Sequence, residues 1–318
     1  MNIKNKFIPI FEPYLQGNEK KYLNICLKTN WISSQGEFIK KFERSLAKYH
    51  KAKYCIATSS CTTALHLSLL SLGVDKNSEV ICPALSFIAP ANMILLTGAK
   101  LVLVDIDPVS LTIDPNLIER KITRKTKAIM VVHQFGHAAH MNEIMKIAKD
   151  YNLKVVEDNA ECVMGKYKNR MVGSIGDVSI FSMQRSKHLT TGDGGVILTN
   201  DKEIAVDLRS LMNHGRDGIY ISASDDKGLT GKELEEVVSR RFSFIHVGHS
   251  FRCTEMEAAI GVGQLKRHKQ IVDRRKEIAE LFTESLSIYG DELQLPVCPK
   301  NRTHSYMLYG LMMKKKDH

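Results

Sequence analysis

A loop lysine is the residue of this sequence best suited to covalent chemistry. Lys187 follows a β-branched run at 178–182 and precedes the glycine-rich turn 192–195. A lysine amine attacks carbonyl carbons when burial or a neighbouring cation lowers its pKa. Arg185 and His188 are the cations beside it. Taken alone, a loop lysine is more often a solvated charge, so the interpretation depends on what surrounds it.

Two further groups stand at the ends of predicted strands. Glu157 and Asp158 close the run 154–157, where a carboxylate either pairs with a protonated ring nitrogen or caps a helix. The hydroxyl-rich turn at 58–63 precedes a helical segment, whose first N–H groups are free and whose dipole attracts anions. That turn predicts a phosphate site, although helix capping accounts for its serines and threonines equally well.

The scaffold for these groups alternates short β-branched runs with helix-length segments. We expect strands at 54–58, 79–82, 101–104, 128–132, 154–157, 178–182 and 195–199. We expect helices at 62–71, 89–96, 116–121 and 141–151, a helix-rich stretch at 252–286, and an exposed insertion at 215–248 with a helix near 232–238. This order predicts an α/β fold with a mostly parallel seven-stranded sheet flanked by helices. Ligands of such sheets lie at the carboxyl ends of the strands, where the three groups above are found.

Composition narrows the class of protein. No apolar run approaches the roughly 18 residues of a membrane span, and the N-terminus lacks an apolar signal core, so we expect a cytoplasmic protein without a membrane partner. The seven cysteines are odd in number and include no C-x-x-C pair, which argues against a disulfide framework or a metal site. The net charge of +10 suits a nucleotide diphosphate, but the basic residues are too dispersed to indicate nucleic-acid binding.

Taken in order, these features identify a resemblance. From about Ile8 to its end, the sequence resembles the DegT/DnrJ group of sugar-nucleotide aminotransferases. The matching segments are 31–36, 58–67, 83–92, 133–136, 157–158, 181–187, 192–195, 213–216 and 255–261. The resemblance implies the aspartate-aminotransferase fold (fold type I), pyridoxal 5′-phosphate as cofactor, and a homodimer.

The resemblance also implies a division of the chain. A large cofactor-binding domain with an N-terminal arm would span 1–250, and a linking helix with part of a small α/β domain would span 251–318. Family members continue beyond the point that corresponds to residue 318, so we expect the small domain to be truncated.

Roles at the cofactor follow from the same resemblance. Lys187 would bind the cofactor as a Schiff base and move protons, while Asp158 would pair with the pyridine nitrogen. Phe87 would stack on the ring. The cofactor phosphate would be held by Ser182, by Cys61 and Thr62, and by Ser250 contributed by the partner subunit. For substrate contacts, the expected residues are His133, His188 and Arg216.

Three positions expected at the cofactor depart from the family pattern. Cys61 stands where glycine is usual in the phosphate turn, and its β-carbon would crowd the phosphate. Ser250 replaces an asparagine and is a shorter donor. Glu161 replaces a glutamine near the phenolic oxygen of the cofactor, where a carboxylate would be repelled unless it is protonated or turned away.

The expected function is transfer of an amino group from an amino-acid donor, by family habit glutamate, to a keto-sugar nucleotide in deoxyamino-sugar or polysaccharide biosynthesis. A sugar dehydratase of the same family is an alternative, but that branch has histidine in place of the Schiff-base lysine, and Lys187 is present here. A second alternative is a homologue that binds the cofactor and regulates without turnover.

Overall fold

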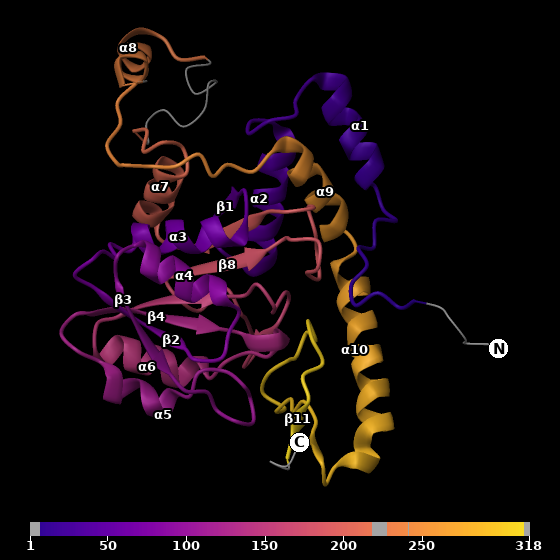
Figure 1. The fold of residues 1–318 in the computed structure, drawn as a ribbon. Helices are drawn as coiled ribbons and strands as arrows, with labels where there is room; N and C mark the ends of the chain where they lie inside the picture. Colours follow the sequence, from indigo (N-terminus) through magenta and orange to yellow (C-terminus); the bar gives the residue numbers. More distant parts are fainter. Residues whose placement is uncertain (1–6, 218–227, 241, 315–318) are drawn as a thin grey trace.

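A seven-stranded sheet forms the centre of the molecule (Figure 1). The computed structural model describes residues 7–217, 228–240 and 242–314. The strands follow the order β1-β9-β8-β5-β4-β2-β3 across the sheet. Their bounds are β1 Tyr54–Thr58, β2 Glu79–Pro83, β3 Lys100–Val104, β4 Thr126–Val132, β5 Lys154–Asp158, β8 Val178–Ser182 and β9 Gly195–Thr199. All seven predicted strands are confirmed, with their ends displaced by two residues at most.

Strand direction brings the chemistry-bearing residues to one edge. Strand β9 runs antiparallel to both of its neighbours, β1 and β8, and the remaining pairs are parallel. The carboxyl ends of β1, β8, β5 and β4 therefore share one edge of the sheet, and the amino end of β9 lies between β1 and β8 at that same edge. The mostly parallel sheet is confirmed.

Helices cover both faces of this sheet (Figure 1). Alternate strand residues point to opposite faces, so one set packs with α3, α4 and α7, and the other packs with α5 and α6 or with α1, α2 and α9. The bounds are α1 Glu19–Thr29, α2 Glu37–His50, α3 Cys61–Ser71, α4 Ile88–Leu96, α5 Pro115–Ile118, α6 Met141–Asp150, α7 Lys202–Leu211, α8 Gly231–Arg240, α9 Glu255–Leu265 and α10 His268–Leu286. The helices predicted from sequence are confirmed, and 116–121 is completed by a 3-10 turn, Glu119–Lys121.

The stretch 252–286 is two helices, because the chain leaves helical hydrogen bonding at Lys266 and Arg267. Helix α9 begins with a capping box in which Thr254 and Glu257 bond each other's backbone N–H groups. Its apolar residues belong to the same buried cluster as α2, so α9 is continuous with the core of the large sheet. The domain boundary near residue 250 stays a prediction.

Smaller elements complete the description. Two short hairpin-like sheets pair β6 Lys166–Tyr167 with β7 Arg170–Met171, and β10 Leu293–Gln294 with β11 Met312–Met313. Helix α8 confirms the helix expected in the insertion, whose polar segment 218–227 lies outside the described residues. No helix in the described ranges is both long and apolar enough to span a membrane.

Candidate functional site

The turn between β1 and α3 presents free amide groups at the shared strand edge. Ser60 caps the helix, because its Oγ accepts the Thr63 N–H at 3.1 Å while Thr63 Oγ1 accepts the Ser60 N–H at 3.2 Å. Within the described residues, the N–H groups of Cys61 and Thr62 donate no hydrogen bond. Two amides at a helix N-terminus are suited to a phosphate.

A glycine on the neighbouring strand makes this turn possible. A β-carbon on Gly195, the first residue of β9, would lie 2.2 Å from the carbonyl oxygen of Ser60 and 2.7 Å from the amide nitrogen of Cys61. Any larger residue at 195 would therefore displace the turn. The sequence shows the glycine-rich turn, but its contact with a segment more than a hundred residues earlier becomes visible only in the fold.

The Cys61 side chain lies among the other candidate residues. Burial, with a further contribution from the negative charge of Asp158, raises the pKa of its thiol well above the ordinary range. Ser182, at the end of β8, and Lys187 both lie near enough to this thiol to oppose part of that rise in its pKa. The structure thus brings Cys61, Asp158, Ser182 and Lys187 together, as the sequence predicts.

Asp158 ends β5 as a buried acid. Its side chain is 4% exposed, and its Oδ1 accepts the Ala160 N–H at 2.9 Å. No helix begins here, so the helix-capping interpretation is wrong. Burial, together with the nearby charge of Glu161, raises the pKa of Asp158 to about 6. A positively charged partner at this carboxylate would offset that cost of burial.

Glu157, the residue before it, has a structural role. Its Oε1 accepts the N–H groups of Ile175 and Gly176 at 2.7 and 2.6 Å, and its Oε2 accepts that of Gly173 at 2.8 Å. Burial alone would raise its pKa, but these bonds and the one from His133 lower it overall. The ionised Glu157 therefore fixes the loop 173–176 beneath the strand edge.

His133 lies elsewhere than predicted. Its side chain is wholly buried, its Nε2 lies 3.1 Å from Glu157 Oε2, and its Nδ1 accepts the Ala139 N–H at 3.0 Å. Because Nδ1 is an acceptor, Nε2 carries the proton and donates to Glu157. Both ring nitrogens are thus occupied inside the protein, and His133 holds Glu157 in place without facing a substrate.

Lys187 faces a second acid, Glu161. Its Nζ lies 3.8 Å from Glu161 Oε1, and both side chains are largely buried. The other oxygen, Oε2, accepts the Phe135 N–H at 2.7 Å. The carboxylate is therefore turned toward an amide and an ammonium, and these two donors compensate its charge.

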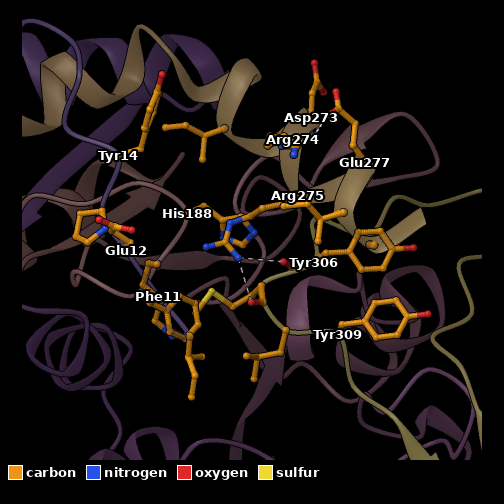
Figure 2. Close-up of a pocket in the computed structure, with 18 of the residues that line it drawn as sticks. Phe11, Glu12, Tyr14, His188, Asp273, Arg274, Arg275, Glu277, Tyr306 and Tyr309 are labelled. Carbon is orange, nitrogen blue, oxygen red and sulfur yellow. Dashed lines mark hydrogen bonds and ion pairs between the residues drawn. The ribbon is translucent and has the colours of Figure 1, made fainter. Parts of the chain in front are cut away.

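Lys187 and His188 line a cavity of about 1070 Å³ between the sheet edge and α10 (Figure 2). His188 is 3% exposed, and its Nε2 donates to the carbonyl oxygen of Ser305 at 2.8 Å. Burial lowers the pKa of His188 to about 3. Other walls come from residues 8–14 of the N-terminal arm, from α10 and from residues 306–309.

Of the predicted site residues, Lys187 and His188 line this cavity, and the groups at Cys61, Thr62, Asp158, Glu161 and Ser182 are not among its walls. Three further predicted residues lie elsewhere. Arg216 lines a second cavity of about 1080 Å³ with Trp31 and Arg252. Ser250 is exposed and forms an isolated β-bridge with Asn213. Phe87 precedes α4 with 71% of its surface exposed. The roles of Arg216, Ser250 and Phe87 at a cofactor or substrate stay predictions.

Known proteins are similar to this chain in sequence and in fold. The chain is 38% identical over 312 residues to a protein named GDP-perosamine synthase from Escherichia coli O157:H7, an alignment that covers 98% of this chain and 79% of the relative. An aminotransferase structure from Psychrobacter cryohalolentis superposes with a TM-score of 0.88 at 28% identity, covering 98% of this chain and 78% of that one. The E. coli GDP-4-keto-6-deoxy-D-mannose-3-dehydratase, solved with bound hydrated PLP, gives a TM-score of 0.86 at 26% identity, with 98% and 80% covered.

Pyridoxal phosphate fits the groups at the sheet edge. The amides of Cys61 and Thr62 suit its phosphate, and the buried carboxylate of Asp158 suits its protonated ring nitrogen. Lys187 lies beside Glu161, and its amine would be the group to hold the aldehyde of the cofactor. These fits, together with the PLP-bound neighbour, confirm the predicted cofactor and fold type I.

A family model extends the match over nearly the whole chain. It is described as the DegT/DnrJ/EryC1/StrS aminotransferase family, and it matches residues 13–318. The match includes every residue placed at the sheet edge above. This chain therefore belongs to the DegT/DnrJ/EryC1/StrS aminotransferase family.

Proposed function

We propose that this pyridoxal-phosphate-dependent aminotransferase moves an amino group from an amino-acid donor, glutamate, to a keto-sugar nucleotide. The observation that carries the proposal is the position of Lys187, which lines a cavity and lies at the same edge as the buried Asp158. The relative named GDP-perosamine synthase supports a sugar linked to a nucleoside diphosphate as the acceptor.

The residues at the sheet edge would have separate roles in this reaction. When bound, the cofactor withdraws electrons from the carbon that loses or gains a proton. Lys187 Nζ would carry that proton at the substrate carbon, since it is the amine that faces the cavity. Asp158 would keep the ring nitrogen protonated, and the amides of Cys61 and Thr62 with Ser182 would orient the phosphate.

Lys187 also separates this proposal from its closest alternative. The dehydratase branch of the family has histidine where this chain has Lys187, so a dehydratase is disfavoured, although a dehydratase is among the similar structures. The second alternative, a cofactor-binding regulator without turnover, predicts a different result. Its cofactor would never take up an amino group from any amino-acid donor.

The test uses the purified chain with pyridoxal phosphate, glutamate and a panel of keto-sugar nucleoside diphosphates, with products identified by mass. Transamination replaces a carbonyl oxygen with an amine, whereas dehydration removes water. Lys187→Ala is the control and should yield no amine. Loss of water without amination would favour the dehydratase, and failure of every donor to convert the cofactor would favour the regulator.

We also propose that the chain works as a homodimer in the cytoplasm. Support for a dimer comes from exposed apolar side chains near Ser250, since Phe242, Phe244 and Val247 are 75%, 54% and 94% exposed. Such surface is typical of interfaces. Light scattering of the purified chain would test this assembly, and a monomer at micromolar concentration would contradict it.

A further inference from the structure

Glu161 occupies a position built for contact with Lys187. Its carboxylate bridges the Phe135 amide, at 2.7 Å, and the Lys187 ammonium, at 3.8 Å. In the described part of the chain, no other carboxylate forms an ion pair with Lys187 Nζ. Glu161 is thus the acid placed to exchange a proton with this amine.

The amide that holds Glu161 is itself fixed by unusual backbone. Phe135 has a φ of 57° and Gly136 a φ of 99°, both in the left-handed region. Residues 305–307 pair with this turn, because Ser305 N–H donates to Gly136 O at 2.8 Å and Met307 N–H donates to Phe135 O at 2.9 Å. A strained turn braced from outside holds Glu161 in one orientation.

Residues 305–307 also contact the loop that carries Lys187. His188, the neighbour of Lys187, donates to the carbonyl oxygen of Ser305, and Arg275 Nη1 donates to the carbonyl oxygens of Tyr306 and Met307 at 3.3 and 3.2 Å. The contacts therefore close a ring from Lys187 through Glu161, the 135–136 turn and residues 305–307 to His188. This ring keeps the amine and the acid facing each other.

Other titratable groups around Lys187 are less suited to take its proton, because of either their protonation state or their position. Burial raises the pKa of the Cys61 thiol, which keeps it protonated, and burial lowers the pKa of His188 to about 3, which keeps it neutral. Asp158 lies in the field of Lys187 without an ion pair, and its carboxylate is suited to the ring nitrogen. Asp193 acts on Cys61 from the glycine-rich turn.

We propose that Glu161 is the base that accepts the proton of Lys187 when the chain captures its cofactor. Lys187 gives one ammonium proton to the Glu161 carboxylate, and its free electron pair then forms the bond to the aldehyde carbon. The two protons left on Nζ depart with the displaced oxygen as water, so charge and atoms balance. Glu161 retains the first proton and becomes neutral beside the phenolic oxygen, where a carboxylate would be repelled.

The test is the rate at which the cofactor-free chain takes up pyridoxal phosphate, followed by stopped-flow absorbance. With Glu161 present, the proton moves within the pair, and uptake should vary little between pH 6.5 and 8.5. In Glu161→Gln, solvent must take the proton, so uptake should slow by about 10²-fold near neutral pH, the usual contribution of a general base. The uptake rate of Glu161→Gln should then rise about tenfold for each unit of pH, because the fraction of Lys187 present as the free amine increases.

Two further variants make the result decisive. Glu284→Gln makes the same chemical change at an exposed position of α10 and should leave uptake unchanged. Glu161→Asp keeps a carboxylate and should keep the shallow pH profile, which serves if Glu161→Gln does not fold. The proposal is overturned if Glu161→Gln captures the cofactor within twofold of the unaltered chain, or if Glu161→Asp shows the steep profile. Because uptake needs no sugar, this test stands apart from the substrate proposed above.

Discussion

Replacing Asp158 with asparagine should stabilise the cofactor-free chain while weakening cofactor binding. Asparagine keeps an oxygen that can accept the Ala160 N–H, and it removes only the charge. Burial raises the pKa of Asp158 from an ordinary 3.8 to about 6. A difference of about two units corresponds to about 3 kcal/mol of unfolding free energy, at about 1.4 kcal/mol per unit.

The sign follows from where the extra proton is bound. Between about pH 4 and pH 6, the folded chain holds a proton on Asp158 that the unfolded chain has released. This group therefore makes the free energy of unfolding fall as pH rises through that window. In Asp158→Asn the residue at 158 does not titrate, so it contributes no such decrease in the free energy of unfolding. We expect the variant to match the unaltered chain near pH 4 and to exceed it by about 3 kcal/mol at pH 7.5.

Denaturant titrations of both cofactor-free proteins at pH 4.5, 6 and 7.5 measure this difference. Asp291→Asn, at an exposed position, is the control and should change stability equally at every pH. Saturating pyridoxal phosphate should stabilise the unaltered chain more than Asp158→Asn, because only the carboxylate provides a counter-charge to the ring nitrogen. A variant that is less stable at pH 7.5, or a difference that does not grow with pH, would refute the electrostatic reasoning.

Three more substitutions test other parts of the site. Lys187→Ala should abolish the visible band of the covalently held cofactor; a retained band would disprove the assignment. Gly195→Ala should weaken cofactor binding at least tenfold in equilibrium titrations, because its β-carbon would lie 2.2 Å from Ser60 O, while Gly290→Ala should bind normally. Glu157→Ala should lower the unfolding free energy by about 3 kcal/mol or more, because two buried amides and one partly buried amide lose their acceptor; a smaller loss by denaturation would count against its structural role.

The sheet could be predicted from sequence because most of its strands are buried on both faces. A run such as Val178–Ser182 is apolar or small at every position and is bounded by polar turns, so its limits are clear. Helices α1, α2 and α7 were not predicted, although Asp201 before α7 is a recognisable N-cap that accepts two N–H groups. The break between α9 and α10 carries neither proline nor glycine, and sequence alone does not place it.

The candidate site could be predicted only where residues follow strand ends. Asp158 and Ser182 meet because β5 and β8 are parallel neighbours, and the order of parallel strands follows from the family resemblance. His133 was misplaced because nothing in the sequence shows that Glu157, one residue before Asp158, needs a buried partner. Hydrogen bonding distinguishes the two buried acids: Glu157 accepts from three amides and a histidine, whereas Asp158 accepts from one amide.

That contrast explains how one acidic pair can have two functions. Glu157 is ionised at low cost because the protein supplies its donors, so it stabilises the loop 173–176 in the absence of any ligand. Asp158 accepts only one hydrogen bond in the described residues, from the Ala160 N–H. Burial therefore disfavours its ionised form in the absence of a cationic partner. The chain thus keeps at the sheet edge a carboxylate that the protonated ring nitrogen of a bound cofactor would stabilise, which would add to the free energy of cofactor binding.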